Sequence, residues 1–170
     1  MSSDIAALGG HTMGTTWSVK LVVPRDRDLH PLHAGIQAQL DRVVAQMSTW
    51  EPGSDISRYN RAHSGHWQAL PDDFWRVLLA AHAVAERSDG AFDPTVGPLV
   101  ALWGFGADAR HRDPPDAAQV ARVAAHCGWQ RLQLDAQAQA LLQPGGLQLD
   151  LSAIAKGYGV DESVIDAYDL

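Results

Sequence analysis

The spacing of apolar residues changes from a strand period to a helix period early in the chain, and this change constrains the fold most. Between Thr16 and Val23 every second residue is a large apolar one, as in a half-buried strand that ends at Pro24. The apolar residues that follow recur at helical spacing, at Leu32, Ile36, Leu40, Val43 and Met47. The chain therefore combines strands with amphipathic helices.

The rest of the chain repeats both signals without a regular alternation. Helices are predicted from Pro71 to about Ser88, from Pro114 to Ala125 and from Ala153 toward the chain end. Short strands are predicted at residues 132–134, 140–142 and 147–151, with the last turn at residues 144–146. This order favours the α+β class, with mixed helices and mostly antiparallel strands, over a doubly wound parallel sheet.

Length and composition predict one globular domain. The chain has 170 residues, 46% of them hydrophobic, and its net charge of −7 argues against a large nucleic-acid interface. No apolar run approaches the roughly 18 residues of a membrane span, so no transmembrane segment is expected. Cys127, the single cysteine, cannot form an internal disulfide and is predicted to be a buried structural thiol.

Two segments have the composition of ligand-binding loops. Residues 89–106 concentrate glycines, prolines and large aromatic residues, which suits close approach of the backbone to a ligand but equally suits a structural loop. Within it, Asp93 is placed to cap a turn through Thr95. In residues 150–161 an apolar strand runs into Ser152, a good helix N-cap, and Lys156 follows one turn later. That arrangement suits a phosphate, although a solvated helix lysine is the simpler reading.

Two further segments allow a binding role or a structural one. Ser54 is predicted to cap a short helix that ends near Asn60, whose amide serves either as a helix C-cap or as a ligand contact. Trp50, on the preceding loop, is either a core residue or a stacking surface for a flat ligand. Residues 12–17 are expected to start a strand. The eight histidines form no convincing metal-binding pattern.

Together and in this order, four segments resemble the ApbE family of FAD:protein FMN transferases. They are TMGTTWSV, MSTWEPGSDISRYN, GAFDPTVGPLVALWGFG and DLSAIAKGYGVD, and the match runs from about Gly10 to the chain end. The resemblance implies a T-fold-like architecture. It also implies an enzyme that splits FAD at its diphosphate, transfers FMN to a Thr or Ser hydroxyl of a target flavoprotein, releases AMP and depends on Mg²⁺.

The resemblance also implies site residues in this chain. Met13 and Trp50 should border the FAD, Ala91, Phe92 and Asp93 should line it, and Asn60 should lie near the flavin nucleotide. Lys156 should reach the FAD and act in catalysis, and the backbone carbonyl of Ala153 should bind the magnesium ion. An electrostatic role for Lys156 at a transferring phosphoryl group agrees with general chemistry, as does an oxygen ligand for magnesium.

The chain is shorter than the family pattern. We therefore expect residues 1–170 to form the N-terminal, FAD-binding portion of an incomplete ApbE-like domain. The C-terminal half, with the remaining metal ligands, would be absent or carried on another chain, so this chain alone is expected to be inactive. An FAD-binding module and an FAD pyrophosphatase remain alternatives. If Met1 is native, the chain is expected in the cytoplasm, and if a signal segment was removed, in the periplasm or anchored to a membrane, as often in the family.

Overall fold

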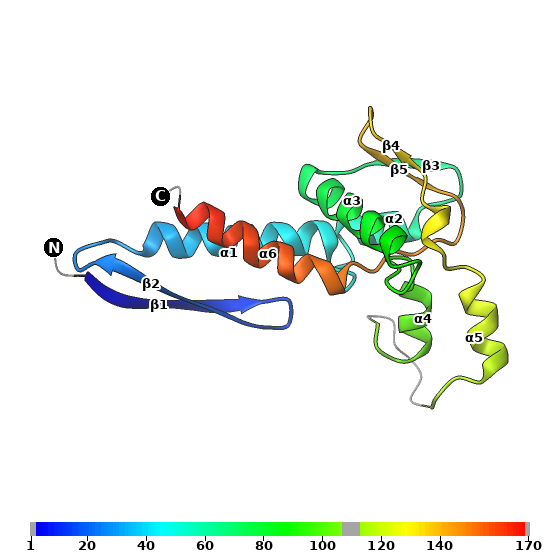
Figure 1. Ribbon diagram of the computed structural model, residues 1–170, viewed down its shortest axis with the longest axis horizontal. Helices are drawn as coiled ribbons and strands as arrows, with labels where there is room; N and C mark the ends of the chain where they lie inside the picture. The colour runs from blue at the N-terminus through cyan, green and yellow to red at the C-terminus, as the bar shows by residue number, and fades with distance from the viewer. Residues whose placement is uncertain (1–2, 107–112, 169–170) are drawn as a thin grey trace.

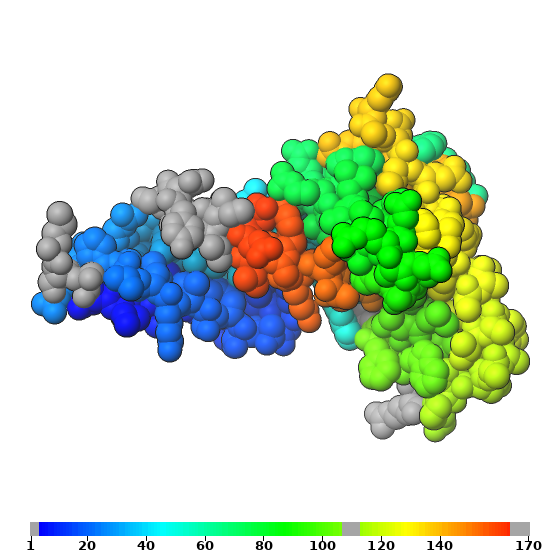
Figure 2. Space-filling model, viewed as in Figure 1, coloured from blue at the N-terminus to red at the C-terminus, as the bar shows by residue number. Residues whose placement is uncertain are grey.

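A long hairpin forms an arm that projects from the rest of the protein. The computed structural model describes residues 3–106 and 113–168. In it β1 (Ser3–Thr12) and β2 (Thr15–Pro24) pair antiparallel along their whole length, with Thr12 opposite Thr15. Both turn residues, Met13 and Gly14, have positive φ values, of 51° and 71°, as a tight two-residue hairpin turn requires. The arm is visible in Figures 1 and 2.

One helix lies against this arm, and a second helix packs on the first. The helix α1 (His30–Met47) buries Leu32, Ile36 and Leu40 against the inner face of the hairpin. The helix α6 (Ser152–Tyr168), which comes last in the chain, packs along α1 (Figure 1). The first and last segments of the chain are therefore brought together.

A compact lobe continues from the other end of α1. It contains α2 (Asp55–Arg61), α3 (Asp72–Arg87) and an antiparallel sheet of order β3-β5-β4 (Figure 1). The strands are β3 (His66–Ala69), β4 (Leu134–Asp135) and β5 (Ala140–Gln143). Between α3 and β4 the chain forms α4 (Gly97–Leu102), α5 (Ala117–Ala124) and the short 3₁₀ helix η1 (Trp129–Arg131). The main core joins α1, α2, α3 and β5 through buried residues such as Val43, Ile56, Phe74 and Leu141.

These elements confirm the α+β prediction, with mixed helices and antiparallel strands. The predicted cap is also present, because Ser54 precedes α2 and its Oγ accepts the Ser57 N–H at 3.1 Å.

The sequence did not predict β1, β3 or α4. Helix α6 begins at Ser152 itself, one position earlier than expected, so Ser152 is not the N-cap that the sequence predicted. The Ile154 N–H donates to the Leu151 carbonyl at 3.0 Å, and the Ser152 N–H donates to Asp150 Oδ1 at 2.8 Å.

The strand predicted at residues 147–151 is wrong. The segment is extended but joins neither sheet of the described chain. Leu147 and Leu149 bond to side chains, whereas Asp150 and Leu151 bond to backbone groups outside any strand. Leu147, Leu149 and Leu151 are fully buried in the main core. The core of this chain therefore covers all three leucines.

No helix in the described part of the chain is both long enough and apolar enough to cross a membrane. Met1 and Leu170, the two ends on which the expectations about location and truncation depend, lie outside the described residues.

Candidate functional site

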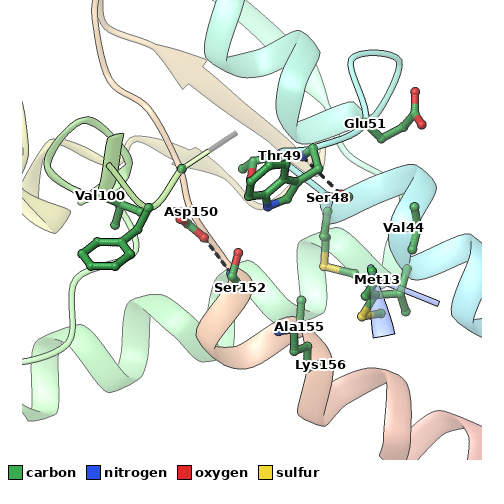
Figure 3. Close-up of a pocket in the computed structure, with 16 residues that line it drawn as sticks. Met13, Val44, Ser48, Thr49, Glu51, Val100, Asp150, Ser152, Ala155 and Lys156 are labelled. Atoms are coloured by element: carbon green, nitrogen blue, oxygen red, sulfur yellow. Dashed lines mark hydrogen bonds between the residues drawn. The ribbon is translucent and has the colours of Figure 1, made fainter. Parts of the chain in front are cut away.

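A hollow lies where the hairpin turn, α1, α4 and α6 meet. It is a cavity of about 680 Å³. Figure 3 shows Asp150, Ser152 and Lys156 on one side, and Ser48 and Thr49 across from Asp150. The lining consists of Met13, Gly14, Val43, Val44, Met47, Ser48, Thr49, Trp50, Glu51, Val100, Phe105, Gly106, Asp150, Ser152, Ala155 and Lys156. A cavity of this size is in the usual range for a small-molecule site, roughly 300–1,000 Å³.

The loop after α1 carries the first wall of the pocket. The Ser48 carbonyl accepts hydrogen bonds from Ser54 Oγ at 2.7 Å and Ser57 Oγ at 3.3 Å, which fixes the loop on the start of α2. The Trp50 N–H donates to Ser48 Oγ at 3.3 Å. The indole of Trp50 is nevertheless 67% exposed, so the loop holds a large apolar ring at the pocket without burying it.

The hairpin turn closes the pocket from the side of the arm. Met13 takes a left-handed conformation that is uncommon for a residue with a side chain, and it packs partly against the main core. A Cβ atom on Gly159 of α6 would lie 3.7 Å from Met13 Cε and 3.4 Å from Leu40 Cδ2. Helix α6 therefore approaches α1 and the turn closely, and this packing directs its first turns toward the pocket.

The start of α6 supplies the charged side of the pocket. The Asp150 N–H donates to the Pro94 carbonyl at 2.8 Å, and the Asp150 carboxylate holds the Ser152 N–H. Ser152 and Lys156 line the cavity, whereas Ala153, the second residue of the helix, is exposed beside them. A helix N-terminus carries a positive dipole end, and the Lys156 ammonium adds to it.

The loop before α4 holds the pocket residue Asp150 through the Pro94 carbonyl. Asp93 Oδ1 accepts from the Thr95 N–H at 2.8 Å and the Thr95 hydroxyl at 2.7 Å, which confirms the predicted turn. Asp93 Oδ2 accepts from the Trp129 N–H at 3.1 Å. Ala91 is exposed, and Phe92 packs against the main core. None of Ala91, Phe92 and Asp93 lines the cavity of the described chain.

Asn60 also lies outside the lining. Its Nδ2 donates to the Leu149 carbonyl at 2.9 Å, and its Oδ1 accepts from the Leu149 N–H at 2.8 Å. The C-cap of α2 is Ala62, so the alternative role as a helix cap is not the one that Asn60 takes. Of the residues predicted for the site, the structure thus brings Met13, Trp50 and Lys156 together around one cavity.

Comparison with known proteins identifies the family of this chain. The sequence matches the ApbE family over residues 13–166, which include both ends of the pocket. This chain belongs to the ApbE family. It is 35% identical to the FAD:protein FMN transferase of Klebsiella pneumoniae (strain 342) over 163 residues, which are 94% of this chain and 47% of that protein. The chain therefore spans about half the length of the curated relatives that it matches.

Solved ApbE structures share the fold. The Pseudomonas stutzeri flavinyl transferase ApbE in its apo form superposes with a TM-score of 0.91 at 34% identity, covering 100% of this chain and 56% of that one. The flavin transferase ApbE of Vibrio cholerae gives a TM-score of 0.93 at 34% identity, covering 99% of this chain and 54% of that one.

The structure adds pocket residues of this ApbE chain that the sequence did not single out. Asp150 opens the DLSAIAKG segment, where only Ser152, Ala153 and Lys156 had been considered. Phe105, in the GFG sequence after α4, lines the cavity and is 76% exposed. The only available signal for either was its place inside a segment that resembles the family.

The pocket joins two chemically different halves. Trp50, Phe105 and Val100 contribute apolar surface, which can cover a flat ring system. The start of α6 contributes an ammonium group, a carboxylate and a hydroxyl, from Lys156, Asp150 and Ser152. Such a site can hold a ligand that has an aromatic part and an anionic part.

Proposed function

We propose that this chain carries the FAD-binding part of an FAD:protein FMN transferase. One observation carries the proposal: Met13, Trp50 and Lys156 come from three separate family segments and line a single cavity. FAD has flat rings and a diphosphate, which correspond to the apolar and charged halves of that cavity.

The described residues suggest how FAD would bind. The exposed rings of Trp50 and Phe105 offer apolar faces for a flat ring, and covering them would remove apolar surface from water. The Lys156 ammonium and the first turn of α6 favour the diphosphate. The Asp150 carboxylate accepts hydrogen bonds from hydroxyl or N–H groups of the ligand. Lys156 keeps its proposed role as the catalytic residue of the chain, since it would stabilise charge on the phosphoryl group.

A magnesium site is part of the same proposal. The carbonyl of Ala153 lies in the first turn of α6, beside Asp150 and Ser152, whose side chains also end in oxygen, the atom that magnesium prefers. These residues fit a hard cation. When bound, the ion would neutralise charge on the diphosphate.

The proposed reaction transfers the FMN phosphoryl group to a protein hydroxyl. A Thr or Ser oxygen of a target flavoprotein forms a new bond to the phosphorus of the FMN half. The bond between that phosphorus and the bridging oxygen breaks, AMP leaves with that oxygen, and the hydroxyl proton is released. The residues of this chain bind and orient the FAD for this displacement.

A narrower function, FAD binding without transfer, is supported by the same pocket, because its aromatic rings and the Lys156 ammonium would bind FAD whether or not transfer follows. FAD pyrophosphatase activity would replace the protein hydroxyl by water. These functions differ in their products, so one experiment separates them.

The experiment incubates the purified full-length protein that contains this chain with FAD, magnesium and an acceptor flavoprotein. Covalent flavin fluorescence on a denaturing gel, together with AMP, supports the transferase. AMP with free FMN shows the pyrophosphatase instead, and saturable FAD binding without either product supports the narrower function. Absence of FAD binding overturns the proposal.

A further inference from the structure

The extended segment at residues 147–151 is held by side chains in place of a neighbouring strand. Gln143 bonds the N–H and the carbonyl of Leu147 at 3.1 and 2.9 Å. Asn60 does the same for Leu149, two residues further along. Buried backbone groups need such partners, and here two amide side chains provide them. The segment is therefore held by separate side-chain contacts at Leu147 and at Leu149.

The Asn60 contact is the one next to the pocket. Leu149 is fully buried, and the following residue, Asp150, lines the cavity. The Asp150 N–H is held by the Pro94 carbonyl, and its carboxylate holds the Ser152 N–H at the start of α6. The two bonds of Asn60 thus fix the peptide units on both sides of Leu149, and the second of these contains the Asp150 N–H.

We infer that Asn60 is a positioning residue that acts on ligand affinity through Asp150. This inference rests on the proposed function, because it takes FAD as the ligand of the pocket. The side chain of Asn60 joins α2 to the segment and lies outside the cavity lining. Its Nδ2 and Oδ1 are both bonded to Leu149, so both polar atoms of the amide hold the segment.

Gln143 provides a matched control. It is a fully buried amide that holds the same segment, but at Leu147, three residues before Asp150. It makes four hydrogen bonds where Asn60 makes two. If lost stability alone weakened FAD binding, Gln143→Ala would therefore have the larger effect.

The first measurement is the FAD dissociation constant of folded wild type, Asn60→Ala and Gln143→Ala, with folding followed by circular dichroism. Asn60→Ala should bind about tenfold more weakly, the usual cost of losing one good contact, and Gln143→Ala should stay within about twofold. Equal effects of the two substitutions overturn the inference. A wild type that fails to bind FAD overturns the proposed function instead, so the two failures are distinguishable.

A double-mutant cycle with Asp150→Ala then tests the route of the effect. If Asn60 acts through Asp150, adding Asn60→Ala to Asp150→Ala should change the dissociation constant by less than about twofold. Additive losses would show that Asn60 affects FAD independently and would refute the inference. If Asn60→Ala or Gln143→Ala does not fold, two milder substitutions replace them in the same comparison. Asn60→Asp keeps the acceptor for the Leu149 N–H, and Tyr59→Phe removes one bond to Leu142.

Discussion

Replacing Gln143 by leucine should destabilise the protein strongly, although leucine is apolar and of similar size. Gln143 is fully buried, and its amide makes four hydrogen bonds. It donates to the carbonyls of Tyr59 and Leu147 at 3.1 and 2.9 Å, and accepts from the N–H groups of Gly145 and Leu147 at 3.0 and 3.1 Å. Gln143→Leu leaves all four backbone groups without this partner.

The magnitude follows from those groups. An unpaired buried donor or acceptor costs about 1–3 kcal/mol. Water can reach the group on Gly145, which is only partly buried, and some relaxation will occur, so a total loss of about 3–5 kcal/mol is expected. That is a large part of the roughly 5–15 kcal/mol that stabilises an ordinary domain.

The assay is urea unfolding followed by circular dichroism, with the free energy of unfolding extrapolated to zero denaturant. Gln133→Leu is the control, since Gln133 is exposed and the same substitution there should change the free energy by no more than about 0.5 kcal/mol. A Gln143→Leu protein within about 1 kcal/mol of wild type would refute the claim that this amide replaces strand pairing.

Three further outcomes are expected. Asp93→Ala should lower the free energy of unfolding by about 2 kcal/mol in urea titrations, because Thr95 and Trp129 lose their acceptor, and an unchanged value would contradict that role. Burial raises the pKa of Tyr59, so the folded state keeps a proton that the unfolded chain loses above the ordinary value of 10.0. Stability should therefore fall as the pH rises past that value, and less steeply in Tyr59→Phe, when unfolding is measured at each pH. Burial raises the pKa of the Cys127 thiol, and the charge of Asp93 raises it further. Iodoacetamide should therefore alkylate Cys127 more slowly at pH 8 than it alkylates a free cysteine, and an equal rate would contradict this.

The helices were predictable because their signals are local. The apolar spacing of α1 and α3 and the serine cap of α2 each lie within one short stretch of sequence, and all three helices formed where expected. The strand β1 was missed because SDIAALGGHT has small residues and weak alternation. Its conformation depends on pairing with β2, which the local pattern does not reveal.

The segment at residues 147–151 shows the limit of periodicity. Alternating leucines predict an extended, half-buried backbone, and the backbone is extended and buried. Whether another strand or distant side chains satisfy its hydrogen bonds depends on residues such as Asn60, which is 89 positions away from Leu149. No spacing rule contains that information.

The site was predictable only in part. Met13, Trp50 and Lys156 were predicted through resemblance to the family and line the pocket. Phe105 and Asp150 became visible only once α4 and α6 were placed around the cavity. For Asn60 and Asp93, the polar atoms bond the surrounding backbone, and their proposed part in FAD binding remains a prediction.

The central claim is that the pocket between the hairpin turn, α1 and α6 binds FAD, and a titration with paired variants tests it most directly. Trp50→Ala and Lys156→Ala remove the aromatic wall and the cation, whereas Trp67→Ala and Lys20→Ala remove an exposed tryptophan and lysine outside the lining. Binding measured by calorimetry should be saturable for wild type. It should weaken at least about fivefold in each of the first two variants and stay unchanged in the other two. Absence of saturable binding, or equal affinity in all four variants, would contradict the account.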